Sequence, residues 1–174
     1  MTREEWLEER KKGIGGSDAA AIIGKNPYKS NVKLWREKTG KEEPEDISDK
    51  PYVKYGTLAE EHLRELFKLD YPDFEVIHRE NTIIKHSKYD FLFASLDGQI
   101  IDKTTGEMGI LEIKTTSILK SMQKEKWKER IPENYYCQIL HYLNVTRIFI
   151  CNTSCRFKVN VWRNSISSNK RLCY

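Results

Sequence analysis

The sequence predicts a single domain of the α/β or α+β class, in which a mixed central β-sheet is flanked by helices. Its 174 residues are enough for one domain with one substantial core. Segments with a helical period come first, segments with alternating apolar residues follow, and a helix pair precedes more strand. Because no internal repeat or low-complexity tract interrupts this order, we expect residues 1–174 to form one domain.

Six segments have the composition or the apolar period that is typical of helices. The expected helices span residues 3–12, 19–23, 31–38, 57–69, 117–130 and 133–143. Ser17 and Asp18 are expected to cap the second of these after a glycine turn, and Thr57 with Glu60 has the spacing of a capping box at the start of the fourth. The charged segment 41–50 is expected to be an exposed loop.

Alternating and β-branched residues predict the strands. They are expected over residues 74–84, 91–101 and 109–115, with final strands at 149 and 157–162. A polar turn over residues 102–107 joins the second strand to the third.

Composition and charge exclude some functions without choosing one. The net charge of +4 permits an acidic partner but does not require one, because lysines, arginines and carboxylates are mixed along the chain. No apolar run approaches the roughly 20 residues that a membrane-spanning helix needs. Residues 1–12 are charged and do not resemble a secretory signal, so we expect a cytoplasmic protein without a membrane partner. A case for nucleic acid must therefore come from a specific site.

All four cysteines fall late in the sequence, at Cys137, Cys151, Cys155 and Cys173. Their spacing does not contain the C-x-x-C pair that is typical of zinc sites. We therefore expect reduced thiols.

The most informative segment contains Asp97 and, after fourteen intervening residues, Glu112-Ile113-Lys114. Side chains alternate along a strand, so Glu112 and Lys114 are expected on one face and Ile113 on the other. Two charges on one face of an apolar strand are unfavourable unless something pairs with them. If the two strands form a hairpin, Asp97 lies alongside.

Such a cluster suits phosphodiester hydrolysis. Carboxylate oxygens hold Mg²⁺, which activates a water molecule and polarises a phosphate, and a lysine stabilises the developing charge. Two simpler interpretations stay open. Asp97-Gly98 is also a common dipeptide in hairpin turns, and Glu112 with Lys114 could be an exposed cross-strand pair.

Four segments in the same order resemble the YqaJ viral recombinase family, which includes the lambda-type exonucleases of the PD-(D/E)XK nuclease superfamily. The matching segments are Arg10 to Asp18 with its G-G-S-D motif, Gly56 to Glu60 (G-x-x-x-E), Asp97 with Glu112-Ile113-Lys114, and Tyr135 to Tyr142 (Y-x-x-Q-x-x-x-Y). The resemblance spans residues from about 10 to 146 and implies a PD-(D/E)XK, restriction-endonuclease-like core.

The resemblance also implies roles for individual residues. Asp97 and Glu112 would bind the metal together with the carbonyl of Ile113, and Lys114 would act on the attacking water. Glu60 would approach the same metal cluster, although its place in a capping box is an alternative explanation. Gln138 would orient the site or the substrate, with an ordinary polar position on its helix as the alternative.

Arg10 and Ser17 match family positions that recognise a terminal phosphate. A serine at a helix N-terminus after a glycine turn, with an arginine on the preceding helix, is independently suited to bind phosphate. The alternatives are that Ser17 only caps its helix and that Arg10 is a solvated side chain.

The resemblance therefore predicts a Mg²⁺-dependent exonuclease, with Mn²⁺ able to substitute, that degrades linear double-stranded DNA from the 5′ end in phage-type recombination. The expected partners are DNA ends, a single-strand annealing protein and further copies of the chain, in a bacterial cell carrying a phage or prophage. Alternatives are a related endonuclease, a Cas4-like nuclease, or an inactive DNA-binding protein. An iron–sulfur cluster is not expected, because no cysteine precedes the catalytic motifs. After about residue 150 the resemblance fades, and a shortened, truncated or frameshifted tail is expected.

Overall fold

The computed structural model describes residues 1–117, 131–148 and 150–158, with residues 116–117 and 150–158 described by their backbone alone. The chain divides into two compact units, and each unit takes three separate stretches of the sequence. The first contains residues 1–45, 79–96 and 131–148, and the second contains residues 46–78, 97–130 and 149–174. The chain thus passes between the units five times. The expectation that residues 1–174 act as one domain stays a prediction.

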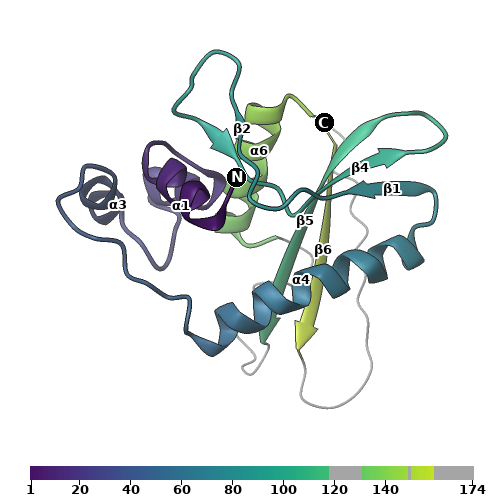
Figure 1. Ribbon diagram of the computed structural model, residues 1–174, viewed down its shortest axis with the longest axis horizontal. Coiled ribbons are helices and arrows are strands. Elements are labelled where there is room, and N and C mark those ends of the chain that lie inside the picture. The colour runs from purple at the N-terminus through teal and green to yellow at the C-terminus, as the bar shows by residue number, and fades with distance from the viewer. Residues whose placement is uncertain (118–130, 149, 159–174) are drawn as a thin grey trace. The chain divides into compact units, whose positions relative to one another are not determined.

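The second unit contains a four-stranded mixed sheet (Figure 1). Its strands are β1 (Phe74–Ile77), β4 (Gly98–Asp102), β5 (Met108–Ser117) and β6 (Ile150–Lys158), in the order β1-β4-β5-β6. The first two pairings are antiparallel and the last is parallel, so the sheet is mixed as the sequence predicts. Residues 157 and 158 of the expected final strand lie in β6, which runs alongside β5 from Ile150, although a shortened tail was expected after about residue 150.

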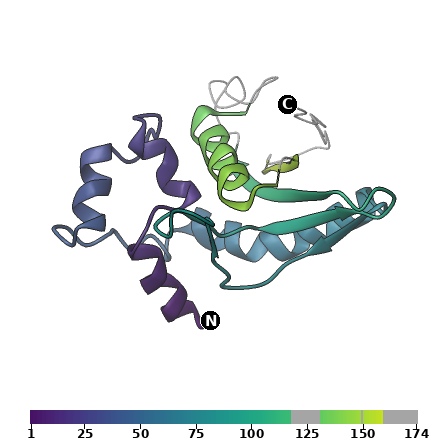
Figure 2. The ribbon, with the colours of Figure 1, turned by 90° about the horizontal axis from the view of Figure 1, so that it is seen from above.

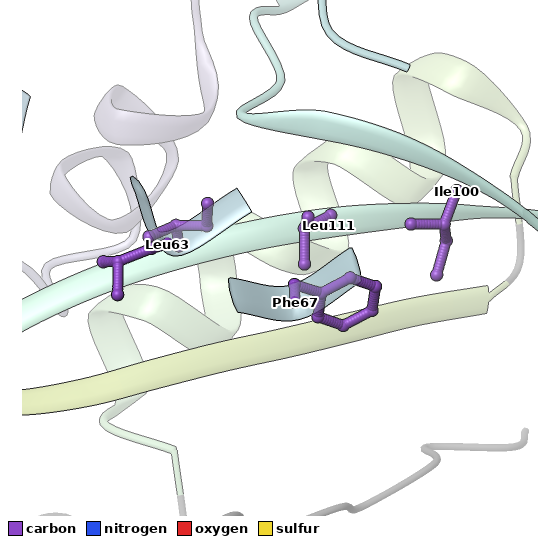
Figure 3. Close-up of a cluster of buried hydrophobic side chains, with 5 residues drawn as sticks. Leu63, Phe67, Ile100 and Leu111 are labelled. Atoms are coloured by element: carbon purple, nitrogen blue, oxygen red, sulfur yellow. The ribbon is translucent and has the colours of Figure 1, made fainter. Parts of the chain in front are cut away.

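Helix α4 (Pro51–Asp70) packs along the face of this sheet that holds the core (Figure 2). Leu63 and Phe67 of the helix meet Ile100 of β4 and Leu111 of β5, as Figure 3 shows, and Ile113 completes the cluster. Fully burying each such side chain contributes roughly 1.5–3 kcal/mol to the stability of the folded state. The apolar residues of α4 and the alternate residues of β5 therefore hold the helix and the central strand together.

The helix begins six residues earlier than the sequence predicts. Pro51 occupies its first turn, where the missing N–H of proline is harmless. Thr57 and Glu60 therefore lie in the helix interior, and the predicted capping box between them is wrong. The early start also carries Gly56 close to the side chain of Thr115, where a Cβ atom would stand 3.3 Å from its hydroxyl.

The first unit is mainly helical. It contains α1 (Arg3–Lys11), α2 (Gly16–Ile22), α3 (Asn31–Lys38), α6 (Glu133–Thr146) and a small sheet of β2 (Ile84–Lys85) and β3 (Phe93–Ala94). Helix α2 packs against α6, and α6 also contacts both short strands. The predicted helices at the start of the chain and over residues 31–38, and the predicted loop over 41–50, are confirmed.

The glycine turn at residues 13–16 is explained by close packing. A Cβ atom on Gly15 would stand 2.8 Å from the ring of Phe93, and one on Gly16 would stand 2.8 Å from Cζ of Tyr142. Ile14 forms a bridge with Leu92, so this segment runs beside the strand region as well. A side chain at position 16 would push α2 away from α6, and one at position 15 would collide with Phe93.

Two predicted strands are each divided between the units. Residues 74–84 form β1 in the second unit and the start of β2 in the first, and residues 91–101 form β3 in the first and most of β4 in the second. Ser95 follows β3 and is held in the first unit by two hydrogen bonds. Its hydroxyl donates to the carbonyl of Thr82 and accepts from the indole N–H of Trp6. Residues 118–130 of the expected helix over 117–130, and the expected strand residues 149 and 159–162, lie outside the described residues. Ser117, the first residue of that expected helix, is the last residue of β5.

We predict that Gly16→Ala lowers the free energy of unfolding by about 1–3 kcal/mol, the usual range for overpacking. The added methyl group would meet the Tyr142 ring. Ser17→Ala, a change of an exposed neighbour, is expected to stay within about 0.5 kcal/mol. Urea unfolding of both variants measures the difference, and equal stabilities would contradict this packing.

Candidate active site

The hairpin of β4 and β5 brings Asp97 beside the segment that contains Glu112. Gly98 pairs with Leu111 in the antiparallel register, so Asp97 lies opposite Glu112 at the open end of the hairpin. One Asp97 carboxylate oxygen, Oδ2, accepts the backbone N–H of Ile113 at 2.7 Å. This bond fixes the Asp97 side chain against the central strand.

Asp97 and Gly98 do not form the hairpin turn. The turn lies at residues 102–107, as predicted, where Asp102 Oδ1 accepts the backbone N–H groups of Thr104 and Thr105 at 2.8 and 3.0 Å. The alternative explanation of the Asp97-Gly98 dipeptide as a turn signal is therefore wrong.

Glu112 and Lys114 form an ion pair on the face of β5 opposite the core. The side chain of Glu112 is 1% exposed and that of Lys114 is 19% exposed. Leu111 and Ile113, on the other face, pack beneath α4. The predicted alternation is thus confirmed, and the alternative of a solvent-exposed charge pair is wrong, because Glu112 is buried.

The surroundings of Glu112 hold more negative than positive charge. The pKa of Glu112 is raised to about 8, mainly by burial and next by the negative charge of Asp97. Lys114 opposes this effect by its charge and its hydrogen bond, while Glu60 adds a smaller increase. The charges of Asp97 and Glu60 therefore both act on Glu112, and Lys114 offsets them only in part, which is an arrangement that favours a bound cation.

Glu60 and Arg64 lie one turn apart on α4, and both are half-buried. Arg64 donates from Nη1 to the backbone carbonyl of Asp97 at 3.4 Å, which ties the helix to the residue that begins β4. Arg64 was not predicted from the sequence. Its spacing of four residues from Glu60 places both side chains on the same side of a helix, and this signal could have found it.

The donor set suits a hard divalent cation. Carboxylate and carbonyl oxygens are the ligands that Mg²⁺ takes from proteins. Among the residues that the structure describes, no three acidic, histidine or cysteine side chains are already arranged to hold a metal ion. Glu112 is engaged with Lys114 and Asp97 with Ile113, so a cation would have to draw the carboxylates together.

Arg10 and Ser17 are brought together in the first unit. Arg10 donates from Nη2 to the Ser17 hydroxyl at 3.1 Å, and its guanidinium lies over the Trp6 ring at 4.3 Å from the centroid. Arg10 is thus held in place rather than freely solvated. Helix α2 is capped at Gly15, whose N–H is accepted by Asp18 Oδ2 at 3.1 Å, so the prediction that Ser17 caps this helix is wrong.

Lys38 is a second residue that was not predicted from the sequence. Its ammonium pairs with Asp18 at 2.9 Å and donates to the Arg10 carbonyl at 2.7 Å. The carboxylate next to Ser17 is thereby neutralised, which favours an anion near the Ser17 hydroxyl.

Gln138 lies on α6 in the same unit as Arg10 and Ser17. Its Nε2 donates to the Tyr142 hydroxyl at 2.8 Å, and a Cβ atom on Gly16 would stand 3.0 Å from its Cγ. The Y-x-x-Q-x-x-x-Y motif therefore supports the packing of α2 through Gln138 and Tyr142. A role of Gln138 in orienting the reaction stays a prediction.

Comparison with known proteins assigns the chain to a family. The family model of the YqaJ-like viral recombinase domain matches residues 5–148. The chain belongs to that family. It is 40% identical over 146 residues to the uncharacterized protein YqaJ of Bacillus subtilis (strain 168), covering 83% of this chain and 43% of that protein. The chain thus spans less than half the length of this relative.

Solved structures confirm the fold class. An alkaline exonuclease from Laribacter hongkongensis superposes with a TM-score of 0.67 at 20% identity, covering 89% of this chain and 74% of that one. The same exonuclease in complex with dAMP gives a TM-score of 0.66 at 21% identity, over 87% and 73% of the two chains. The chain therefore has the PD-(D/E)XK fold that the sequence predicts. No helix among residues 1–117 and 131–148 is long and apolar enough to cross a membrane.

We predict that the metal-free protein loses stability as the pH rises from about 5 to 8, in part through Glu112. The raised pKa of Glu112, about 8 against 4.5, means that the folded protein keeps a proton which the unfolded chain releases across this range. Glu112→Gln should flatten the dependence, whereas Glu107→Gln, an exposed change on the same hairpin, should not. Urea midpoints in EDTA measure it, and parallel pH profiles for wild type and Glu112→Gln would contradict it.

Proposed function

We propose that the protein is a divalent-metal-dependent deoxyribonuclease that degrades linear double-stranded DNA from its ends, with 5′-to-3′ polarity, in phage-type homologous recombination. The observation that carries the proposal is the buried Glu112–Lys114 pair beside Asp97, on the central strand of a PD-(D/E)XK fold. Membership of the YqaJ-like viral recombinase family supports the same function.

Asp97, Glu112, Glu60 and the Ile113 carbonyl are the groups that would hold Mg²⁺, or Mn²⁺ in its place. A divalent ion bound there would polarise the scissile phosphate and lower the pKa of a bound water. Asp97 is already oriented by Ile113 N–H, and Arg64 holds its backbone. The cation would then have to draw the side-chain oxygens of these carboxylates together.

Lys114 is the charged group that remains on the strand once Glu112 is engaged by a cation. Its side chain is largely buried beside Glu112, where an ammonium stabilises developing negative charge more strongly than in water. In this proposal Lys114 orients the attacking water and stabilises charge on the phosphate oxygens. Gln138 contributes to orienting the substrate.

The Arg10–Ser17 pair supports action at DNA ends. Arg10 and the Ser17 hydroxyl already contact each other, and Lys38 neutralises the nearby Asp18. A terminal 5′ phosphate would accept hydrogen bonds from both groups. A single-strand annealing protein as partner, a homo-oligomeric assembly and a bacterial cytoplasm as the location belong to the same proposal.

We predict that linear duplex is lost in the presence of Mg²⁺, that EDTA stops the loss, and that a closed circular duplex survives. Asp97→Ala should lower the rate by at least about 100-fold, the order of effect for one charge-stabilising group. Gel analysis of both DNA forms measures this. Cutting of the circle would refute end-directed cleavage, and no cutting by the folded protein would refute the enzyme.

A second readout separates metal binding from catalysis. Mg²⁺ should raise the thermal midpoint of the wild-type protein, since a ligand that binds only the folded state stabilises it. The same addition should leave the midpoint of Asp97→Ala unchanged.

We predict that wild-type protein degrades 5′-phosphorylated duplex about 10-fold faster than unphosphorylated duplex, and that Arg10→Gln removes this preference. One charge-assisted bond contributes roughly 1.5–3 kcal/mol, which sets the expected size. Arg3→Gln is the matched control, because Arg3 lies on the same helix and faces the same Trp6 ring at 5.6 Å. Equal loss of preference in both variants would contradict a phosphate role for Arg10.

A further inference from the structure

The segment between β2 and β3 is a short hairpin whose backbone is held by its own hydrogen bonds. His86 N–H donates to the Leu92 carbonyl, and Leu92 N–H donates to the Tyr89 carbonyl, both at 2.9 Å. The buried ring of His86 accepts the N–H groups of Lys88 and Tyr89 at Nδ1, at 3.0 and 3.1 Å. The loop therefore has a defined conformation.

The hairpin is also attached to the glycine turn. Ile14 N–H donates to the Phe91 carbonyl at 2.6 Å, and Phe93 N–H donates to the Ile14 carbonyl at 3.0 Å. A Cβ atom on Gly13 would collide with the Phe91 carbonyl. The backbone around Phe91 is thus fixed on both sides.

Aromatic side chains project from this fixed backbone into solvent. Tyr89 is 44% exposed and Phe91 is 55% exposed. Tyr89 stacks on His86 with 5.2 Å between ring centroids, and the Lys88 ammonium lies 5.1 Å from the Tyr89 centroid. Exposed rings that are not needed for a core, next to a cation, are typical of surfaces on which nucleobases stack.

A hollow of about 300 Å³ lies beside Phe91, and we call it the Phe91 hollow. Its lining comprises the apolar side chains Ile83, Phe91 and Phe93, the backbone of Gly13, and the charged residues Glu9, Lys12, Lys85 and Asp90. This volume is at the small end of the range for ligand sites. The hollow would accept one small group.

The charged residues around the hollow sum to zero net charge, so they do not favour a phosphate as the ligand. Glu9 pairs with Lys12 and with Lys85, the latter at 3.5 Å, and Asp90 offsets the remaining positive charge. Two amines and two carboxylates together offer both donors and acceptors with no net charge. A nucleobase has donors and acceptors on its edge and an aromatic face, so it complements both the charged residues and the rings.

We propose that the Phe91 hollow binds an unpaired nucleobase of single-stranded DNA. The inference rests on the proposed nuclease function, which generates a single strand from a duplex. Lys12 in the hollow and Ser17 are five positions apart in the sequence, so their Cα atoms are at most about 18 Å apart. With a rise of about 3.4 Å per base pair, the hollow lies within roughly five base-pair steps of the proposed end-binding pair.

Binding of single strands to the metal-free protein tests the proposal without requiring cleavage. The probe is a fluorescein-labelled 12-nucleotide oligodeoxythymidine in EDTA, followed by anisotropy, with an abasic oligonucleotide of equal length as the comparison. Phe91→Ala should weaken binding of oligodeoxythymidine by about 5- to 150-fold, the effect of losing one stacked base. Phe91→Tyr should restore it, and the abasic strand should be insensitive to both variants.

Tyr28→Ala is the matched control, because Tyr28 is an 85% exposed ring in the same unit but outside the hollow. Equal affinity of Phe91→Ala and wild type, or equal weakening by Tyr28→Ala, would overturn the proposal. Displacement of the oligonucleotide by an equal concentration of free thymidine monophosphate would assign the hollow to a mononucleotide instead of a strand. Base-dependent binding through Phe91 in a protein that cleaves no DNA would support the hollow and refute only the nuclease.

Discussion

Burial of Glu112 in the central strand is the constraint on which the candidate active site depends. A carboxylate that is 1% exposed is stable only if neighbouring groups compensate for the water it has lost, and Lys114 is the described group that does so directly. The opposite face of the same strand places Leu111 and Ile113 in the core beneath α4. One strand thus anchors the second unit through one face and concentrates charge on the other. A change that moved the strand would disturb both.

Helix α4 connects the core to the site in the same way. Leu63 and Phe67 hold it against the sheet, and the adjacent side of the helix carries Glu60 and Arg64. Arg64 reaches the Asp97 carbonyl, and Glu60 is close enough to raise the pKa of Glu112. The helix can therefore position a carboxylate and a guanidinium only because its apolar side is packed. This connection explains why the G-x-x-x-E motif lies on a long helix rather than on a loop.

The glycine turn organises the first unit for a similar reason, which is close approach rather than flexibility. Gly15 and Gly16 allow Phe93 and Tyr142 to approach the backbone, and this approach sets where α2 begins. The position of α2 in turn places Ser17 within reach of Arg10. On the other side of the turn, Ile14 holds the hairpin that carries Phe91. The proposed phosphate pair and the Phe91 hollow therefore share one structural support.

The sequence by itself determined the helices over residues 3–11 and 31–38, the turn at 102–107 and the shared face of Glu112 and Lys114, because these depend on local spacing and on the two-residue period of a strand. Only the tertiary structure decided the rest. Alternation predicts an extended chain but not its partner, so the strands predicted at 74–84 and 91–101 proved to be divided between two units. Likewise, the spacing of Thr57 and Glu60 fits a capping box, but the helix begins at Pro51, so Glu60 is an interior residue. The burial of Glu112 and the hydrogen bond from Arg64 to the Asp97 carbonyl both depend on residues that are far apart in the chain. A local sequence pattern cannot predict such contacts.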